Sequence, residues 1–242
     1  MQVKLSQAVK MFFGNSSLEM VFFEAIANAL DAEANEITIS ITAKALNQPE
    51  TLQIEISDNG LGFTNERYNK FSKLFDVEES SHKGLGRLVY LCYFDDVKVI
   101  SNYDKVKVRE FDFNEGFKED NFKSSIVPET KSGTVFKMTS YVLQRIAKNE
   151  YVSADYLKSR ILQEFYSRLF HLKDNGQRVV ININTNIENH KKELILLNSD
   201  IPKFKTVELE SSVNLIDTFY LHYSIKEVDP SESSLIAAVS VD

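Results

Sequence analysis

The stretch from residue 24 to residue 33 constrains the fold of this chain more than any other part of its sequence. Glu24, Asn28 and Asp31 are spaced i, i+4, i+7, and at about 100° per residue this spacing places all three on one face of a helix. The opposite side is apolar, and four alanines flank the polar strip with almost no bulk. The pattern predicts a helix that ends near Glu33, buries one face and leaves the other open to close approach.

An ordinary amphipathic helix also has a polar face, which usually meets only water. A solvated face normally carries several long charged side chains, yet no lysine or arginine occurs between Lys10 and Lys44. The helical pattern alone leaves two interpretations open, a solvated face and a ligand-binding face. The segments that follow in the chain decide between them.

Two short segments after this helix alternate apolar and polar residues. Residues 37–42 and 52–56 both follow this pattern, and the turn residues 47–49 lie between them. Alternation with period two is typical of half-buried β-strands. The sequence therefore predicts a β-hairpin directly after the helix.

The second predicted strand runs into Asp58, which is followed by Gly60 and Gly62. Glycine permits a positive φ and lets a ligand approach the backbone closely. The same residue types are common in simple turns. The motif by itself leaves a turn and a binding loop as alternatives.

A second glycine cluster occupies residues 84–87, between the charged, serine-rich segment 76–83 and an apolar helix predicted over 88–94. Unpaired N–H groups and the helix dipole make the start of a helix a favourable place for phosphate. This cluster is a candidate phosphate-binding segment, with an ordinary loop as the alternative.

The rest of the chain consists mainly of further strands and one long helix. Short connections favour an antiparallel meander, and Asp174-Asn175-Gly176 predicts a hairpin turn. The predicted helices are 3–13, 64–75 and 153–171, and the predicted strands are 97–102, 106–113, 121–127, 134–140 and 179–184. These elements predict an α+β fold, a two-layer sandwich of a mixed, mostly antiparallel sheet with helices on one face, rather than a doubly wound parallel sheet.

The chain is expected to hold one domain over residues 1–200, followed by a linker and the start of a second domain over 201–242. Ile201-Pro202 opens the linker, residues 213–225 contain strand-like runs, and residues 235–241 form an apolar strand. We expect the sequence to be a fragment cut near the start of that second domain.

Composition and charge exclude several classes of function. The net charge of −7 argues against broad nucleic-acid binding by this segment, because such binding depends on lysine and arginine neutralising phosphates. The single cysteine, Cys92, excludes an internal disulfide, and its apolar surroundings predict a buried, reduced thiol. No apolar stretch reaches the ~18 residues that span a bilayer. We therefore expect a cytoplasmic protein that does not bind membranes.

Four motifs in a fixed order resemble the nucleotide-binding motifs of the GHKL ATPases, the superfamily of gyrase B, the large heat-shock chaperones, MutL, MORC proteins and histidine kinases. The motifs are Glu24-x3-Asn28-x2-Asp31-Ala32, Asp58-x-Gly60-x-Gly62, Lys83-Gly84-Leu85-Gly86 and Gly133-Thr134. The resemblance covers roughly residues 15–185. It implies a domain that binds ATP with Mg²⁺, hydrolyses it, and acts as a conformational or dimerisation switch in a longer protein.

The resemblance also implies a role for each motif residue. Glu24 would be the catalytic base and Asn28 the Mg²⁺ ligand, since a carboxylate suits proton abstraction and an amide oxygen suits a hard cation. Asp31 and Ala32 would lie near the nucleotide. Asp58 would accept a hydrogen bond from the adenine amino group.

The glycines and the lid complete the implied ATP site. Gly60 and Gly62 would pass close to the base, and Thr134 would lie near it. Residues 76–87 would form a mobile lid whose phosphate contacts come from Lys83, Gly84, Leu85, Gly86 and Arg87. Lids of the chaperone type often carry a glycine where this chain has Ser81, so this lid is expected to close differently.

Three functions are open at this point. An ATP-hydrolysing switch is favoured by Glu24, because histidine kinases typically have asparagine there. A histidine or protein kinase is the alternative, although His82, His171, His190 and His222 lack the setting of a phospho-acceptor. The third is a nucleotide-binding scaffold without turnover. In many relatives a cationic residue from the next domain completes the site, so hydrolysis by this fragment is expected to be slow.

Overall fold

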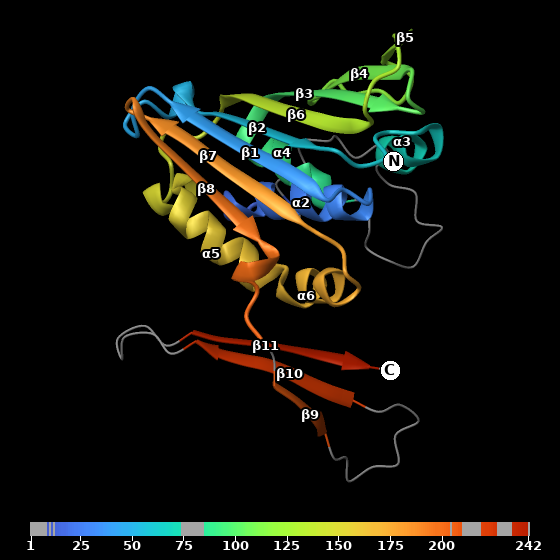
Figure 1. Ribbon diagram of the computed structural model, residues 1–242. Coiled ribbons are helices and arrows are strands. Elements are labelled where there is room, and N and C mark those ends of the chain that lie inside the picture. Colours follow the sequence, from blue (N-terminus) through green and yellow to red (C-terminus); the bar gives the residue numbers. More distant parts are fainter. Residues whose placement is uncertain are drawn as a thin grey trace. The chain divides into compact units, whose positions relative to one another are not determined.

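Two sheets form the framework of the computed structural model (Figure 1). The structure describes residues 9, 11, 13–73, 85–203, 205–209, 219–226 and 234–241. The chain divides into two compact units, residues 1–158 with 180–196, and residues 159–179 with 197–242. Each unit has its own sheet. The expected domain boundary near residue 200 stays a prediction.

The first unit holds the eight-stranded sheet and most of the helices. Its elements are α2 (Glu19–Asp31), β1 (Glu36–Ala43), η1 (Pro49–Thr51), β2 (Gln53–Asp58), α3 (Asn65–Ser72), η2 (Gly86–Val89), α4 (Tyr90–Tyr93), β3 (Phe94–Tyr103), β4 (Lys107–Phe113), β5 (Lys123–Ile126), β6 (Gly133–Tyr141), η3 (Asn149–Val152), β7 (Val180–Ile187) and β8 (His190–Leu197). Helix α5 (Ala154–Glu164) crosses the boundary between the units.

The large sheet is mixed and mostly antiparallel. Its strand order is β5-β4-β3-β6-β2-β1-β7-β8. Strand β1 pairs in parallel with β7, whereas the pairs from β1 across to β5 are antiparallel. The predicted α+β fold is confirmed.

The helix and hairpin expected near the start of the chain are both present. Strand β1 buries Ile37, Ile39 and Ile41 on one face, and its pairing with β2 joins Ile39 to Ile56. Helix α2 buries its apolar side and lies, with α4, along one face of the sheet (Figure 1). Of the polar strip, Glu24 and Asn28 are half-buried and Asp31 is exposed.

The expected meander is wrong at its last strand. Strand β6 does not continue from β5 but lies between β3 and β2. This insertion pairs Thr134 with Asp58 on one side and with Ser101 on the other. Two motifs that are far apart in the sequence are thereby brought side by side.

Three further predictions differ from the structure. The helix expected over 153–171 is broken at Phe165, which has φ −101° and ψ 13° and lies between α5 and α6 (Tyr166–Asp174). Gly176, with φ 74°, follows the end of α6 and begins no hairpin, because β7 pairs in parallel with β1. Strand β8 was not expected, since its first four residues are polar and exposed.

The glycine cluster leads into a less regular helix than the sequence predicts. Residues 86–89 form a 3-10 turn, η2, and only residues 90–93 are α-helical. Residues 74–84 lie outside the described part of the chain, so most of the proposed lid and the end of the helix expected over 64–75 lie outside it too. Of the helix expected over 3–13, only residues 9, 11 and 13 are described, and they are helical.

The second unit contains α6, the short turn η4 (Asn198–Asp200) and a three-stranded antiparallel sheet. The strands are β9 (Lys205–Leu209), β10 (Phe219–Lys226) and β11 (Ser234–Val241), in the order β11-β10-β9. The strands expected near 213–225 and 235–241 correspond to β10 and β11, whereas β9 was not expected.

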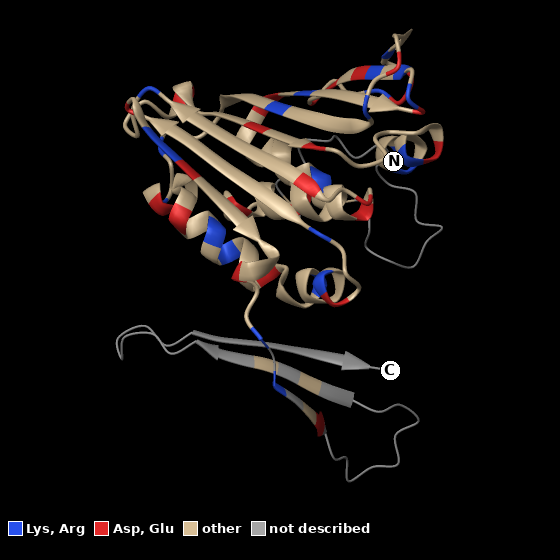
Figure 2. Cartoon of the chain, in the orientation of Figure 1, with Lys and Arg blue, Asp and Glu red and all other residues tan. Residues whose placement is uncertain are grey.

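The distribution of charged residues and the apolar length of the helices are two further features of the described residues. Acidic and basic residues are interspersed over the described part of the chain (Figure 2). No helix within that part is long and apolar enough to cross a bilayer. Cys92 is a free thiol and is half-buried rather than buried.

Candidate functional site

Glu24 and Asn28 form a hydrogen-bonded pair on the polar strip of α2. The Asn28 Nδ2 donates to Glu24 Oε1 over 3.0 Å. Burial raises the pKa of Glu24, and the charge of Asp31 adds to this effect, while the Asn28 hydrogen bond and the charge of Arg87 lower it. Because burial is the largest of these causes, Glu24 is a better proton acceptor than a solvated glutamate.

Ala32, at the end of α2, joins this helix to the first glycine segment. Its carbonyl oxygen accepts a hydrogen bond from the Leu61 N–H over 2.8 Å. A Cβ placed on Gly60 would lie 2.5 Å from that oxygen and 2.8 Å from the Ala32 Cβ. Any larger side chain at Gly60 would therefore push the two segments apart. Asp31 is exposed, and its carbonyl oxygen accepts a hydrogen bond from Arg67.

Asp58, at the end of β2, is held by the backbone around it. Its Oδ1 accepts a hydrogen bond from the Gly60 N–H over 2.8 Å. Burial raises the pKa of Asp58, while the N–H groups of Gly60 and Thr134 and the charge of Arg67 lower it. The result is a fixed, partly desolvated carboxyl group next to a loop of glycines.

Ser101 is a buried polar residue of this site that the sequence analysis did not select. It is fully buried, accepts a hydrogen bond from the Phe63 N–H over 2.7 Å, and lies 3.4 Å from the Thr134 hydroxyl. A Cβ on Gly62 would lie 2.8 Å from the Ser101 Oγ, and Gly62 has φ 70°. A serine in the buried phase of the alternation along β3 is the signal that could have identified it.

Arg109 fastens the end of the glycine loop to β4. It is 4% exposed and donates hydrogen bonds to the carbonyl oxygens of Phe63 and Thr64 and to Asn65 Oδ1, over 2.7, 3.2 and 2.6 Å. Its guanidinium group also lies over three aromatic rings, those of Tyr68, Tyr103 and Phe122. The buried Arg109 side chain therefore holds in place the end of the loop that carries Gly60 and Gly62.

Replacing Arg109 by lysine is expected to lower the free energy of unfolding by about 2 to 4 kcal/mol, because an ammonium group cannot reproduce the fork that reaches three acceptors. Denaturant unfolding measures this change. The matched control is Lys98→Ala, which removes a solvent-exposed ion pair to Glu110 in the same pair of strands, worth about 0 to 1 kcal/mol. Equal losses in the two variants would contradict the anchoring role.

Gly86 lies directly against the carboxylate of Glu24. A Cβ at this position would be 2.2 Å from Glu24 Oε2 and 2.6 Å from its Cδ. The end of the second glycine cluster is thus in contact with the polar strip of α2. Lys83 and Gly84 lie outside the described residues, and Leu85 is half-buried at the start of η2.

Arg87 is directed to the end of α3. It is 6% exposed and donates to the carbonyl oxygens of Lys70 and Lys73 over 3.3 and 3.0 Å. Burial lowers the pKa of Arg87 to about 10. Its charge acts on Glu24 from this position without a direct ion pair.

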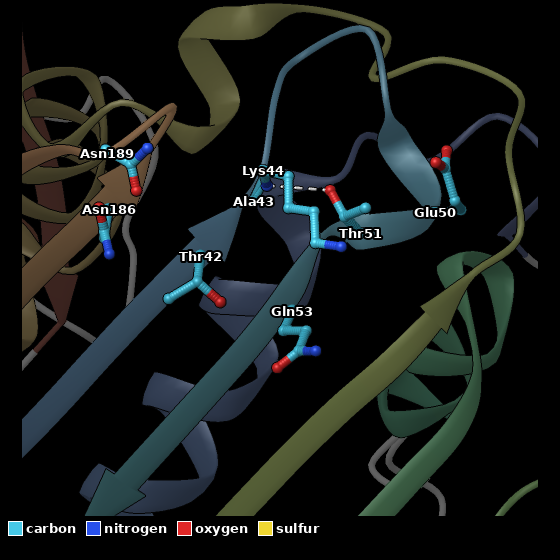
Figure 3. A pocket seen from close by; sticks show the side chains of 8 residues that line it. All are labelled: Thr42, Ala43, Lys44, Glu50, Thr51, Gln53, Asn186 and Asn189. Atoms are coloured by element: carbon cyan, nitrogen blue, oxygen red, sulfur yellow. Dashed lines mark hydrogen bonds between the residues drawn. The ribbon is translucent and has the colours of Figure 1, made fainter.

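A separate cavity of about 450 Å³ lies where the β1–β2 connection meets the end of β7 (Figure 3). Its lining residues are Thr42, Ala43, Lys44, Glu50, Thr51, Gln53, Asn186 and Asn189. None of them belongs to the four motifs. This cavity is distinct from the site around Glu24 and Asp58.

Known structures share the fold of this chain. The N-terminal domain of a DNA repair protein superposes with a TM-score of 0.54 at 15% identity, covering 91% of this chain and 70% of that one. The topoisomerase IV ATP-binding domain of Francisella tularensis gives 0.51 at 16% identity, with 78% and 92% covered. The 43K ATPase domain of Thermus thermophilus gyrase B gives 0.52 at 15% identity, with 88% and 59% covered. At these identities the likeness concerns the fold.

The family itself is identified from the sequence. A search of curated proteins found no significant match. The profile of the histidine kinase-, DNA gyrase B- and HSP90-like ATPases matches residues 14–140, a range that contains Glu24, Asn28, Asp58, Gly86 and Thr134. The chain therefore belongs to the family of histidine kinase-, DNA gyrase B- and HSP90-like ATPases.

Proposed function

We propose that this domain binds ATP with Mg²⁺, hydrolyses it, and acts as a nucleotide-driven conformational or dimerisation switch in a longer cytoplasmic protein. The observation that supports the proposal best is the contact among three motif residues: Glu24 accepts a hydrogen bond from Asn28 and lies against Gly86. The proposed base, the side chain of the proposed Mg²⁺ ligand and the last glycine of the proposed lid thus lie close together.

In this proposal the adenine ring lies against Asp58 and the glycine loop. The free acceptor capacity of the Asp58 carboxylate would bind the exocyclic amino group, because a carboxylate accepts hydrogen bonds and the amino group donates them. Gly60 and Gly62 let the loop pack closely against Ala32 and against Asn102 and Ser101, which would keep the loop in place beside the base, and Thr134 would lie near it.

The triphosphate would extend along α2 toward the lid. Asn28 would hold Mg²⁺ through its Oδ1, with Asp31 nearby. Within the described residues no three His, Cys, Asp or Glu side chains cluster as a metal site, and Mg²⁺ is commonly held by few protein ligands together with phosphates. Lys83, Gly84, Leu85 and Gly86 would contact the phosphates, and Arg87 would contribute charge.

Hydrolysis would use Glu24 as the general base. The carboxylate takes the proton from a water molecule as the water oxygen attacks the γ-phosphorus, and the bond to the ADP oxygen breaks. The raised pKa of Glu24 suits this step, because a base is most effective when its pKa lies near the working pH. Asn28 keeps the carboxylate in one orientation.

Replacing Gly86 by alanine is expected to lower the rate of ATP hydrolysis by about 10- to 100-fold, because the new Cβ displaces the Glu24 carboxylate and small misplacements are costly in catalysis. Phosphate release at saturating ATP measures the effect. Gly116→Ala is the matched control, since the nearest atom to its Cβ is 3.4 Å away and belongs to the side chain of Asn114. An unchanged rate in Gly86→Ala would contradict the proposed contact.

Calorimetric titration of the 242-residue chain with ATP tests the proposal itself. We expect ATP and ADP to bind in the presence of Mg²⁺, and ATP to bind more weakly when EDTA removes the metal. Light scattering with a non-hydrolysable ATP analogue reports dimerisation. Absence of binding by both nucleotides would overturn the proposed function.

The fate of the γ-phosphate separates hydrolysis from the alternatives. With radiolabelled ATP, hydrolysis releases free phosphate, whereas a kinase leaves the label on protein. Saturable binding with neither outcome in the intact protein would indicate a scaffold without turnover.

A further inference from the structure

We infer that Ser101 is a positioning residue of the proposed adenine site: its buried hydroxyl group accepts a hydrogen bond from the Thr134 hydroxyl, so that Thr134 offers only an acceptor to the base. This inference rests on the proposed ATP-binding function and deepens it. It assigns part of the base selectivity to a residue outside the four motifs.

Four polar residues form a row across the large sheet, at the end of an otherwise apolar face. Asp58 on β2 pairs with Thr134 on β6, which pairs with Ser101 on β3. Ser101 pairs in turn with Arg109 on β4. Directly paired residues of adjacent strands point to the same face of a sheet. The two neighbouring rows of this face are buried and apolar, with Ile56, Phe136, Val99 and Phe111 in one and Ile54, Met138, Val97 and Phe113 in the next.

The hydroxyl group of Ser101 has three polar neighbours within this row and the adjoining loops. Ser101 is 0% exposed, and its Oγ accepts a hydrogen bond from the Phe63 N–H over 2.7 Å. It donates to the Gly133 carbonyl oxygen over 3.3 Å and lies 3.4 Å from the Thr134 Oγ1. One buried hydroxyl group thus joins the first glycine loop to the Gly133-Thr134 motif.

The number of donors and acceptors decides the direction of the contact between Ser101 and Thr134. A serine hydroxyl group has one hydrogen to donate and two lone pairs that can accept. If the hydrogen goes to the Gly133 oxygen, one lone pair accepts from the Phe63 N–H and the other from the Thr134 hydroxyl. If the hydrogen goes to Thr134 instead, the bond to Gly133 is lost. Only the first arrangement satisfies all three contacts, and buried polar groups are normally satisfied.

The direction of this hydrogen bond sets what Thr134 offers to a nucleotide. With its hydrogen bonded to Ser101, the Thr134 oxygen can only accept a further hydrogen bond. The ionised Asp58 carboxylate, which is next to Thr134 in the row, is an acceptor as well. Two neighbouring acceptors suit the exocyclic amino group of adenine, which donates, and disfavour a base that carries an oxygen there. Ser101 therefore contributes to selectivity for adenine through Thr134.

Ser101→Ala tests the inference through the ratio of ATP affinity to ITP affinity, because ITP carries an oxygen where ATP carries the amino group. We expect ATP binding to weaken by about 3- to 10-fold, the effect of one hydrogen bond. The ratio should fall by about 10-fold, since the freed Thr134 hydroxyl can turn and donate to the ITP oxygen. Calorimetric titration with each nucleotide in Mg²⁺ measures both affinities. The kcat for ATP should stay within about twofold, because the contacts of Ser101 do not include Glu24.

Ser72→Ala is the matched control for this substitution. Ser72 is also buried, but its hydroxyl group donates to the Asn69 carbonyl oxygen of its own helix, α3, over 3.3 Å. This variant should keep the parent affinity for both nucleotides. Ser101→Cys is a second test variant, because its thiol occupies the same place and is only a weak hydrogen-bonding group. It should lower the affinity ratio in the same direction, and it answers the question if Ser101→Ala does not fold.

A double variant separates the positioning of Thr134 from a general loosening of the glycine loop. Thr134→Val removes the hydroxyl group through which Ser101 acts, so it should lower the affinity ratio by itself. In that background Ser101→Ala should cause no further change in the ratio, since the two residues act as one unit. A loosened loop would instead weaken the binding of ATP and ITP equally.

Several outcomes would overturn the inference. These are a parent chain that binds ATP and ITP equally, an unchanged affinity ratio in both Ser101 variants, an equal fall in Ser72→Ala, or a further fall in the double variant. If the parent chain binds neither ATP nor ADP, the proposed function fails first. If it prefers ATP to ITP and both Ser101 variants keep that preference, only the role of Ser101 fails.

Discussion

Replacing Glu24 by glutamine is expected to lower the rate of ATP hydrolysis by about 10²- to 10⁴-fold, the usual contribution of a general base, with ATP affinity changed only a few-fold. The amide has the same shape and its oxygen can still accept the hydrogen bond from Asn28 Nδ2, but it cannot take a proton from water. Single-turnover phosphate release measures the rate, and calorimetry measures the affinity.

The matched control for Glu24→Gln is Glu66→Gln. Glu66 lies on α3, and its side chain is 80% exposed in an ion pair with Lys70. This control should hydrolyse ATP at the parent rate. If Glu24→Gln also keeps the parent rate, another group must activate the water, and the assignment of the base would be wrong.

Replacing Asp58 by asparagine is expected to weaken ATP binding by about 10- to 100-fold or more, because a donor replaces an acceptor opposite the adenine amino group and a buried hydrogen bond is lost. The same change is expected to stabilise the empty domain at neutral pH. Binding and stability should thus move in opposite directions, which a general disruption of the fold would not produce.

The pH dependence of this stabilisation has a definite sign. Burial raises the folded-state pKa of Asp58 above its unfolded value, so the ionised carboxylate destabilises the folded state at pH values above the folded pKa. The advantage of Asp58→Asn is fully present there and disappears as the pH falls below the unfolded pKa of about 3.9. Glu24 titrates in both proteins and cancels from the difference.

Denaturant unfolding at neutral pH and near pH 4 checks this prediction. Asp112→Asn is the control, because Asp112 is exposed on β4 and should change neither binding nor stability. A stability difference between Asp58→Asn and the parent that grows on acidification would contradict the argued cause.

Local patterns predicted much of the first half of the fold. Helix α2 and the β1–β2 hairpin follow from periodicities of 3.6 and 2 within about forty residues, and their apolar residues are buried as expected. The position of β6 depends on pairing with two strands that lie elsewhere in the sequence, and no local pattern encodes it. The break at Phe165 likewise accompanies the burial of two adjacent aromatic side chains, Phe165 and Tyr166.

The candidate site was predicted less completely than the fold. Glu24 and Asn28 stand out because polar groups at helical spacing flanked by alanines are unusual, and Asp58 stands out because it ends a predicted strand just before two glycines. Ser101 resembles an ordinary member of a strand in the sequence. Its significance depends on burial and on hydrogen bonds to residues of other segments, which only the three-dimensional arrangement provides.

The parallel pairing of β1 with β7 has a consequence for synthesis of the protein on the ribosome. Glu36 lies opposite Val180, so the two are separated by 180 − 36 = 144 residues. Until β7 has emerged from the exit tunnel, one edge of β1 has no strand to pair with, and closing so long a loop slows folding. During that interval the backbone N–H and C=O groups along this edge of β1 have only water to bond to, so the sheet cannot be completed until residue 180 and those after it have been made.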